Sequence, residues 1–321
     1  MYSSAALPHP EKQLIQRLRN LARYRGRLPR SLVTGIGDDC ALLRLPPRQQ
    51  LLVTTDFTLE DVHFRRAWHP AASVGHRCLA RGLSDIAAMG GEPLAAFLSL
   101  ALPRDLRQSW VDEFLRGLLR LARQFRLPLA GGDVAQSPAA ILADIMVVGT
   151  TPPGQAILRS AARAGDRIYV TGRPGSSAAV LQLLRRGKKL RPRSFPAHFF
   201  PVPRIAVGRY LRQKRIASAM IDISDGISTD LAHICEESCT GAVLWPERIP
   251  TDRLGYALHG GEDYELLFTV AKSRRVPHSI AGVPVTPIGE IIRSRTPVIW
   301  LEEGGRRRRL AICGWEHFRA G

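Results

Sequence analysis

Short apolar runs that lead into aspartate limit the folds open to this chain more than any other feature of its sequence. The runs are β-prone, and the acids stand beside glycine, serine or threonine in GIGDD (35–39), TTD (54–56), GGD (131–133) and IDISDG (221–226). Asp85 is the exception, because its neighbours form a mostly apolar helical pattern. A single aspartate of this kind is usually a turn former or a helix N-cap. Several with the same pattern, in a chain of net charge +18, indicate carboxylates that gather around cations, since like charges repel. Oxygen ligands of this type suit Mg²⁺.

Helix and strand patterns are mixed in both halves of the chain. The spacing of apolar residues predicts helices at 11–24, 74–89, 109–125, 176–184, 203–213 and 227–237. It predicts strands at 51–55, 94–102, 127–130, 141–148, 167–170, 219–223 and 264–270, the first of which ends at Asp56. The order lacks the strict βαβ alternation of a doubly wound sheet, which favours an α+β fold. The basic stretch 185–203, which contains proline, is interpreted as a mobile loop.

The composition changes near residues 150–165, where Thr150-Thr151-Pro152-Pro153-Gly154 is followed by Gly165-Asp166. Stretches rich in proline and glycine often connect domains. The length of 321 residues suits two domains of about 150 residues each. We therefore expect domains at 1–150 and 151–321.

The chain lacks the signatures of the common nucleotide-binding folds. It has no GxxxxGK[ST] loop, no kinase HRD or DFG motif and no GxGxxG after a strand. The glycine pairs Gly131-Gly132 and Gly260-Gly261 are each followed by an acid, and they permit close approach of the backbone to a phosphate or metal. A nucleotide site would therefore hold phosphates mainly through Mg²⁺ bridged to aspartate.

The positive charge and the cysteines bear on partners and location. Lysine and arginine number 46 against 28 acidic residues, which favours polyanionic partners such as nucleotides. A nucleic-acid-binding protein would also interleave aromatic residues with its basic clusters, and the clusters at 185–193 and 306–309 are interpreted instead as solvated loops. The five scattered cysteines are typical of buried thiols in a reducing compartment. Neither a signal peptide nor a run of about 18 apolar residues is present, so we expect a cytoplasmic protein without membrane spans.

Eight stretches together resemble the thiamine-monophosphate kinase family, within the superfamily of aminoimidazole ribonucleotide synthetase. They are GIGDDCALL (35–43), TTDFTLEDVHF (54–64), LSDIAAMGGEP (83–93), GGD (131–133), RSAARAGDRIYVTGRPGSSAA (159–179), IDISDGISTDL (221–231), GGEDYELLFTV (260–270) and IGEI (288–291). They run in the family's order across nearly the whole chain. The resemblance implies the two-domain α+β fold of that superfamily, with mixed or antiparallel sheets and helices packed on them. It also implies a homodimer formed through an N-terminal domain that binds ATP and Mg²⁺, with a C-terminal domain that completes the active-site cleft.

The resemblance implies ATP-dependent phosphorylation of thiamine monophosphate to thiamine diphosphate. Several Mg²⁺ ions would be held by Asp39, Thr54, Thr55, Asp56, Asp85, Asp133, Asp222 and Asp225. ATP would be bound by Gly132, Asp133, Arg159 and Ser224, and thiamine monophosphate by His63, Glu262 and Trp315. The acceptor is itself a phosphate with a second pKa of about 6, so it is mostly dianionic at neutral pH and needs no general base. We expect direct in-line transfer assisted by Mg²⁺.

The chain departs from the family's pattern after Asp133. The family commonly reads GGDTTRG there, whereas this chain has Val134-Ala135-Gln136 and lacks two hydroxyls and a cation. The segment before His63 also carries the acids Glu60 and Asp61, where the family usually has one at most. These departures leave open a divergent or inactive relative that binds ATP with a different small-molecule substrate. Selenophosphate synthetase and the hydrogenase-maturation protein fit less well, because this chain lacks their reactive cysteines.

Overall fold

The computed structural model describes residues 11–22, 31–36 and 40–315. The chain divides into two compact units, each with its own sheet. Unit 1 comprises Met1–Leu83, Pro93–Pro153 and Arg191–Phe200, and unit 2 comprises Ser84–Glu92, Gly154–Leu190 and Pro201–Gly321. Sheets and helices occur in both units, so the predicted α+β fold is confirmed.

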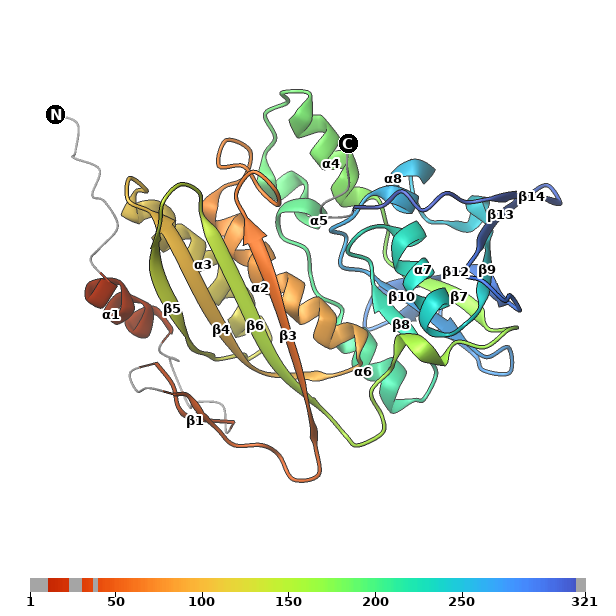
Figure 1. The fold of residues 1–321 in the computed structure, drawn as a ribbon, viewed down its shortest axis with the longest axis horizontal. Helices are drawn as coiled ribbons and strands as arrows, with labels where there is room; N and C mark the ends of the chain where they lie inside the picture. The colour runs from red at the N-terminus through yellow and green to blue at the C-terminus, as the bar shows by residue number, and fades with distance from the viewer. Residues whose placement is uncertain (1–10, 23–30, 37–39, 316–321) are drawn as a thin grey trace. The chain divides into compact units, whose positions relative to one another are not determined.

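A four-stranded sheet forms the centre of unit 1, in the order β3-β6-β4-β5. The β3 and β6 strands are antiparallel, whereas β4 and β5 are parallel. Helices α2 and α3 cover one face of this sheet (Figure 1). The elements of unit 1 are α1 (Glu11–Ala22), β1 (Leu32–Thr34), β2 (Leu42–Leu43), β3 (Gln50–Leu59), α2 (Ala71–Ala88, whose last turn lies in unit 2), β4 (Glu92–Pro103), α3 (Gln108–Gln124), β5 (Leu129–Ser137), β6 (Leu142–Thr151), η2 (Pro192–Ser194) and α5 (Pro196–Phe199).

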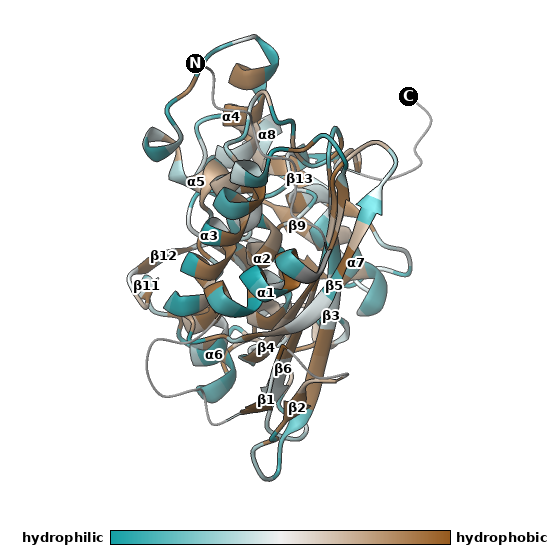
Figure 2. Ribbon diagram, turned by 90° about the vertical axis from the view of Figure 1, so that its left-hand side faces the viewer, coloured by the Kyte–Doolittle hydropathy of each residue, from teal (hydrophilic) through white to brown (hydrophobic). Residues whose placement is uncertain are grey.

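Helices α2 and α3 pack unusually closely because each has a glycine where they cross. A Cβ at Gly75 of α2 would lie 1.9 Å from the carbonyl oxygen of Phe114, and a Cβ at Gly117 of α3 would lie 1.8 Å from that of Ala72. The apolar residues of α3 recur at helical spacing and are buried, and its turns change from brown to teal across the helix in Figure 2. The sheet therefore has one face sealed by a tight helical layer.

On the other face of the unit 1 sheet, the edge strand β3 carries exposed apolar side chains. A Cβ at Gly82 of α2 would lie 2.6 Å from Val147 of β6, and Val147 is in register with Thr54 of β3. Because successive side chains of a strand point to opposite faces, the odd-numbered residues of β3 face away from the helices. Among them Leu51, Val53 and Phe57 are 49%, 60% and 54% exposed. Exposed apolar side chains that gather on one face, here with only Thr55 between them, mark interaction surfaces.

Unit 2 is built on an eight-stranded sheet in the order β14-β13-β9-β12-β7-β10-β8, with β11 paired to β12. Its pairs are antiparallel except for β13 with β9. The elements of unit 2 are η1 (Arg159–Ala161), β7 (Arg167–Thr171), α4 (Ser176–Arg185), α6 (Ile205–Gln213), β8 (Met220–Asp222), α7 (Ile227–Glu237), β9 (Gly241–Leu244), η3 (Pro246–Arg248), α8 (Leu254–His259), β10 (Leu266–Val270), β11 (Ser279–Ile280), β12 (Val283–Ile292), β13 (Ile299–Glu303) and β14 (Arg306–Arg309).

The central strands of unit 2 carry its core. Strand β10 is buried at every position, as expected for a strand with neighbours on both edges and cover on both faces. Helix α7 packs on this sheet through Ile227, Leu231 and Ile234, all of them fully buried. A rigid core of this kind fixes the loops that leave the ends of β7, β8 and β10.

Four sequence predictions about elements are wrong. Strand β3 does not end at Asp56 but continues to Leu59, and β5 extends past Gly131 to Ser137, because the ladders with β6 and β4 outweigh the local preference of aspartate and glycine for turns. The stretch 185–203, predicted to be a loop, contains η2 and α5, and its His198 and Phe199 are buried. Residues 306–309, also predicted to be a loop, form the exposed edge strand β14.

Across the described residues, each helix is either too short or too polar to cross a bilayer.

Candidate functional site

Strand β3 presents three of the predicted metal ligands on two faces. Thr54 and Asp56 are two residues apart, so they share the face that is in register with Val147 and Ile145 of β6. Thr55 lies on the opposite face, where its hydroxyl donates to Asp144 Oδ1 at 3.3 Å. The pairing explains why Asp56, which the sequence analysis put at a strand end, lies within a continuous ladder.

Gly132 and Asp133 lie side by side in β5, and both are exposed. Gly132 has a φ of +147°, and a Cβ there would lie 1.8 Å from the carbonyl oxygen of Leu98 in β4. Only glycine fits against the neighbouring strand at this position. The Asp133 carboxylate accepts the backbone N–H of Val134 at 2.8 Å. Residues 134–136, where this chain differs from the family's pattern, therefore lie within strand β5. The difference does not remove the backbone hydrogen bond that holds the Asp133 side chain.

A cavity of about 540 Å³ lies beside these two residues in unit 1. Helix α1, the segment around Ile36 and strands β4 and β5 line it, mostly with apolar groups; its lining includes Ile15, Leu18, Gly35, Ile36, Cys40, Ala41, Phe97, Leu98, Leu129, Ala130, Gly131, Gly132, Asp133 and Val134. An apolar cavity with an acid at its margin suits a flat ring that carries charged groups at one end. Gly132 and Asp133 could be identified from the sequence, whereas Ile36 and Phe97 could not, because an apolar side chain carries no mark of a ligand.

His63 is held in one orientation by the turn that follows β3. The backbone N–H of Leu59 donates to His63 Nδ1 at 3.0 Å, so a neutral ring carries its proton on Nε2. The Arg77 guanidinium also donates to the His63 carbonyl oxygen at 3.4 Å. The ring is therefore oriented so that Nε2 acts as a hydrogen-bond donor.

One of the two acids before His63 has a structural role. Glu60 Oε2 accepts the backbone N–H of Ile141 at 3.0 Å, and its other oxygen pairs with Arg66. These contacts tie the turn at 60–64 to the start of β6. Asp61 has a left-handed φ of 65° and forms an exposed ion pair with Arg65 at 3.7 Å. The extra charge of Glu60 is thus neutralised within the turn.

Unit 2 brings Asp222 next to the last turn of α2. Asp222 ends β8 and is buried, and it accepts a hydrogen bond from the Ser84 hydroxyl at 2.7 Å. Asp85 follows Ser84 directly in the helix, as the sequence analysis predicted. Two of the predicted metal ligands therefore lie in neighbouring elements of one unit.

A third acid, Asp230, supports the turn after β8 and was missed by the sequence analysis. It is buried in the first turn of α7 and accepts the backbone N–H groups of Asp225 at 3.2 Å and Gly226 at 3.0 Å. Burial raises its pKa well above the usual range, and the negative charges of Asp222 and Asp225 raise it further. The carboxyl-rich turn therefore suits a hard cation, which would relieve this repulsion.

The glycine-rich segment before β10 lies directly on this turn. The Glu262 N–H donates to the Ser224 carbonyl at 2.8 Å, and a Cβ at Gly261 would lie 2.0 Å from the same oxygen. The Trp315 N–H donates to the Asp225 carbonyl at 3.3 Å, and the Trp315 side chain is 49% exposed. Unit 2 thus gathers four predicted site residues from three segments that are far apart in the sequence.

The remaining predicted residues are less closely connected. Arg159 begins η1, its side chain is exposed, and its carbonyl oxygen accepts the Ser238 hydroxyl at 2.7 Å. Asp39 lies outside the described residues. Asp56 and Asp133 belong to unit 1, whereas Asp85, Asp222 and Asp225 belong to unit 2. Within 11–22, 31–36 and 40–315, no three histidine, cysteine, aspartate or glutamate side chains form a metal-binding group, so the metal centre stays a prediction.

Known proteins match the chain over nearly its whole length. Residues 37–151 match the family model "AIR synthase related protein, N-terminal domain". The thiamine-monophosphate kinase of Escherichia coli O157:H7 is 37% identical, over 93% of this chain and 97% of that protein.

Solved structures show the same likeness. The crystal structure of thiamine-monophosphate kinase from Stenotrophomonas maltophilia K279a is 32% identical, with a TM-score of 0.78 over 89% of this chain and 95% of that one. A structure described as AaThiL complexed with AMPPCP and TMP is 31% identical, with a TM-score of 0.76 over 86% and 89%. On the identity and coverage of these relatives, the chain belongs to the thiamine-monophosphate kinase family.

Proposed function

We propose that this protein transfers the γ-phosphate of ATP to thiamine monophosphate and so forms thiamine diphosphate. The family relationship supports this reaction, and the structure of one relative is described as complexed with AMPPCP and TMP. The observation that carries the proposal is the pairing of Glu262 with Ser224, because it brings a predicted substrate residue onto a predicted ATP residue within one unit.

The apolar cavity of unit 1 is our candidate for the nucleotide base. Its apolar lining would accept a flat ring, and Gly132 and Asp133 stand at its margin. We assign Arg159 and Ser224 to the phosphates of ATP. Val134 lines the cavity where the family has a hydroxyl, so base contacts in this chain rely more on apolar packing.

We assign several Mg²⁺ ions to the acidic set, which consists of Asp39, Thr54, Thr55, Asp56, Asp85, Asp133, Asp222 and Asp225. The all-oxygen donors and the mutual repulsion at Asp222, Asp225 and Asp230 fit a hard cation. When bound, the ions supply the positive charge that two mutually repelling phosphates need in order to approach. Asp222 is oriented for this role by the Ser84 hydroxyl.

The acceptor phosphate needs no base, so the protein's task is to orient it. His63 would donate a hydrogen bond from Nε2 to a phosphate oxygen, since Nδ1 accepts from Leu59. The exposed Trp315 ring offers a π-face to the cationic thiazolium. Glu262 would bind a polar group of the acceptor. We therefore propose direct in-line transfer without a phosphoenzyme.

We also propose that the protein is a homodimer joined through unit 1, which we take as the domain that binds ATP and Mg²⁺. The exposed apolar row of Leu51, Val53 and Phe57 supports this assignment. All five cysteines are free thiols, which is consistent with the cytoplasmic location that we propose. The prediction that they are buried holds only for Cys78 and Cys235, because Cys40, Cys239 and Cys313 are exposed.

The test is product formation by the purified protein with ATP, Mg²⁺ and thiamine monophosphate. We expect thiamine diphosphate and ADP in equal amounts, and no product when Mg²⁺ is chelated. ATP binding without product would overturn the proposed acceptor and favour the alternative of a divergent relative, whose other phosphorylated acceptors could then be screened. Stable transfer of label from γ-labelled ATP to the protein would contradict direct transfer.

A further inference from the structure

The segment between α8 and β10 has an unusual backbone. Glu262 and Tyr264 have left-handed φ values of 64° and 53°, although neither is a glycine. This conformation is costly for residues with a Cβ and persists only where the surrounding structure enforces it. Glu262 is half-buried, whereas Asp263, Tyr264 and Glu265 are buried. Something must therefore hold the backbone on either side of Glu262.

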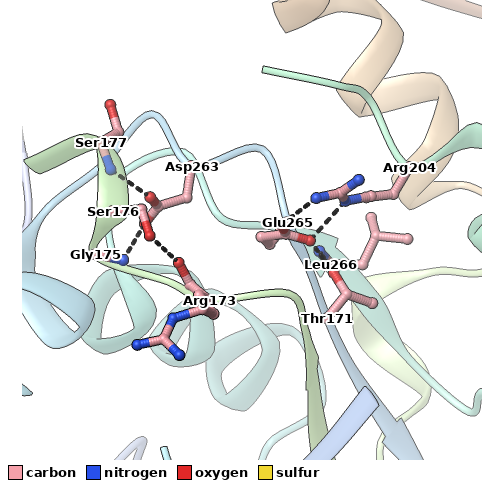
Figure 3. Close-up of polar contacts among 9 residues, drawn as sticks. All are labelled: Thr171, Arg173, Gly175, Ser176, Ser177, Arg204, Asp263, Glu265 and Leu266. Atoms are coloured by element: carbon pink, nitrogen blue, oxygen red, sulfur yellow. Dashed lines mark hydrogen bonds and ion pairs between the residues drawn. The ribbon is translucent and has the colours of Figure 1, made fainter. Parts of the chain in front are cut away.

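The Asp263 carboxylate holds one side. It accepts the backbone N–H groups of Gly175 at 2.6 Å and Ser177 at 3.0 Å, at the start of α4 (Figure 3). These N–H groups are among those that a helix cannot satisfy internally, and the positive end of the helix dipole favours a carboxylate there. Asp263 thus joins the segment to a helix that is distant in sequence.

The Glu265 carboxylate holds the other side. It accepts hydrogen bonds from the Thr171 hydroxyl at 2.5 Å and from Arg204 Nε at 2.7 Å, and a second guanidinium nitrogen contacts its other oxygen (Figure 3). The Thr171 hydroxyl also accepts the N–H of Leu266 at 2.8 Å. A Cβ at Gly172 would lie 2.0 Å from the Glu265 carboxylate, so glycine leaves the room that this cluster needs.

Backbone hydrogen bonds anchor the two left-handed residues from a different direction. The N–H of Glu262 donates to the Ser224 carbonyl at 2.8 Å, and that of Tyr264 donates to the Ile223 carbonyl at 3.0 Å. Residues 263 and 265 are therefore held through their side chains, and residues 262 and 264 are held through their backbone N–H groups. Of the three acidic side chains in the segment, that of Glu262 is the one that is partly exposed.

We propose that Asp263 and Glu265 are positioning residues, which hold the left-handed backbone at 262 and 264 so that the Glu262 carboxylate meets the phosphorylated acceptor. The inference rests on the proposed function, which assigns Glu262 to that substrate. Buried carboxyl groups are costly unless they are hydrogen-bonded. Their burial is compensated by partners that also fix the direction of the chain.

The test is a double-mutant cycle on the proposed reaction. Asp263→Asn keeps the shape but cannot accept both N–H groups of α4, and we expect it to raise the KM for thiamine monophosphate about tenfold with little change in the KM for ATP. If Asp263 acts through Glu262, then Asp263→Asn adds nothing further in a chain that already carries Glu262→Gln. Asp252→Asn is the matched control, because Asp252 forms an exposed ion pair with Arg173 in the same region.

The outcomes separate this inference from the proposed function. No product from the wild-type protein contradicts both. A normal wild-type rate with an unchanged acceptor KM in Asp263→Asn contradicts the inference alone, as do additive effects in the cycle. If Asp263→Asn fails to fold, Thr171→Val decides: it removes one donor from Glu265 and leaves Arg204 in place, and we expect the acceptor KM to rise about threefold. An unchanged KM in that variant contradicts the inference.

Discussion

The backbone N–H of Glu262 donates to the carbonyl oxygen of Ser224 at 2.8 Å, so the segments GGEDYE and DISDG lie against each other. Trp315 joins the same turn through the Asp225 carbonyl. Three regions separated by tens of residues thus meet at the end of β8.

Asp222→Asn should reduce kcat at least about a hundredfold, because the variant loses the charge that a cation requires but not the side-chain shape. Its thermal unfolding midpoint should stay near that of the wild type, since an amide oxygen can still accept from Ser84. Steady-state kinetics and calorimetry measure the two effects. Asp133→Asn makes the same test in unit 1. A wild-type rate in both variants would rule out the proposed metal ligands.

His63→Gln should retain more activity than His63→Ala. The glutamine amide nitrogen can occupy the place of Nε2 and still donate to the acceptor phosphate, whereas alanine offers no donor. We expect the acceptor KM to rise about tenfold in the first variant and about a hundredfold in the second. The KM for ATP is the internal control. Equal effects of the two substitutions would mean that the Nε2 donor is not what the substrate requires.

Gly132→Ala should destabilise unit 1 by about 3 kcal/mol or more, because the added Cβ would overlap the carbonyl of Leu98. Gly187→Ala is the matched control: Gly187 also has a positive φ, of +74°, but no atom lies within 4 Å of its Cβ position. The control should lose only about 1 kcal/mol. Denaturant unfolding compares the two, and similar losses would show that strain alone, not the strand contact, decides the effect.

Stability should depend on pH through Asp263. Burial raises the pKa of this carboxyl to about 7, while its two backbone donors lower it and the charges of Glu265 and Glu262 raise it. Below the unfolded pKa of about 4 both states hold the proton. Between that value and about 7 the unfolded chain releases the proton and the folded one keeps it, so the contribution to stability is lost as pH rises.

Asp263→Asn, which stays neutral, should remove this part of the pH dependence. The wild type should therefore lose stability between pH 5 and pH 8, and the variant should not lose this part. The free energy of unfolding of the variant minus that of the wild type should be more positive at pH 8 than at pH 5. Urea unfolding of both proteins at the two pH values gives the comparison. Parallel pH profiles would mean that Asp263 ionises in the folded protein as it does in the unfolded chain.

Phe57→Glu should weaken the proposed dimer, because it places a charge in the exposed apolar row on β3. Leu45→Glu serves as the control, since Leu45 is also exposed but lies after β2, away from that row. Sedimentation velocity should give a dimer for the wild type and the control and a monomer for Phe57→Glu. A monomeric wild type would contradict the dimer directly.

Much of the fold could be predicted from sequence because helix periods and glycine stops are local signals. Helix α7 occupies the range predicted for it, and Asp85 lies in a helix as its apolar neighbours indicate. Strand lengths could not be predicted in the same way. The continuation of β3 through Asp56 depends on its ladder with β6, which is a long-range interaction.

The candidate site could be predicted only in part, because it also depends on long-range contacts. In the sequence, Glu262, Asp263 and Glu265 are three acids in one short segment, and nothing distinguishes their roles. Only their burial and hydrogen-bond partners show that Glu262 is partly exposed, whereas Asp263 and Glu265 hold the backbone on either side of it. Asp230 was missed because its role is to accept amides of its own turn, which resembles any acid early in a helix. Phe97 carries no polar signal at all, and only the cavity reveals it.

The four arginines of β14 have a consequence for how copies of this protein meet. They form an exposed strand at the end of the unit 2 sheet, where unpaired backbone groups would otherwise accept a strand from another molecule. Two such edges in register would bring rows of guanidinium groups together, and their repulsion opposes sheet extension. The positive charge of β14 therefore opposes aggregation through this edge, and this role does not depend on binding a ligand.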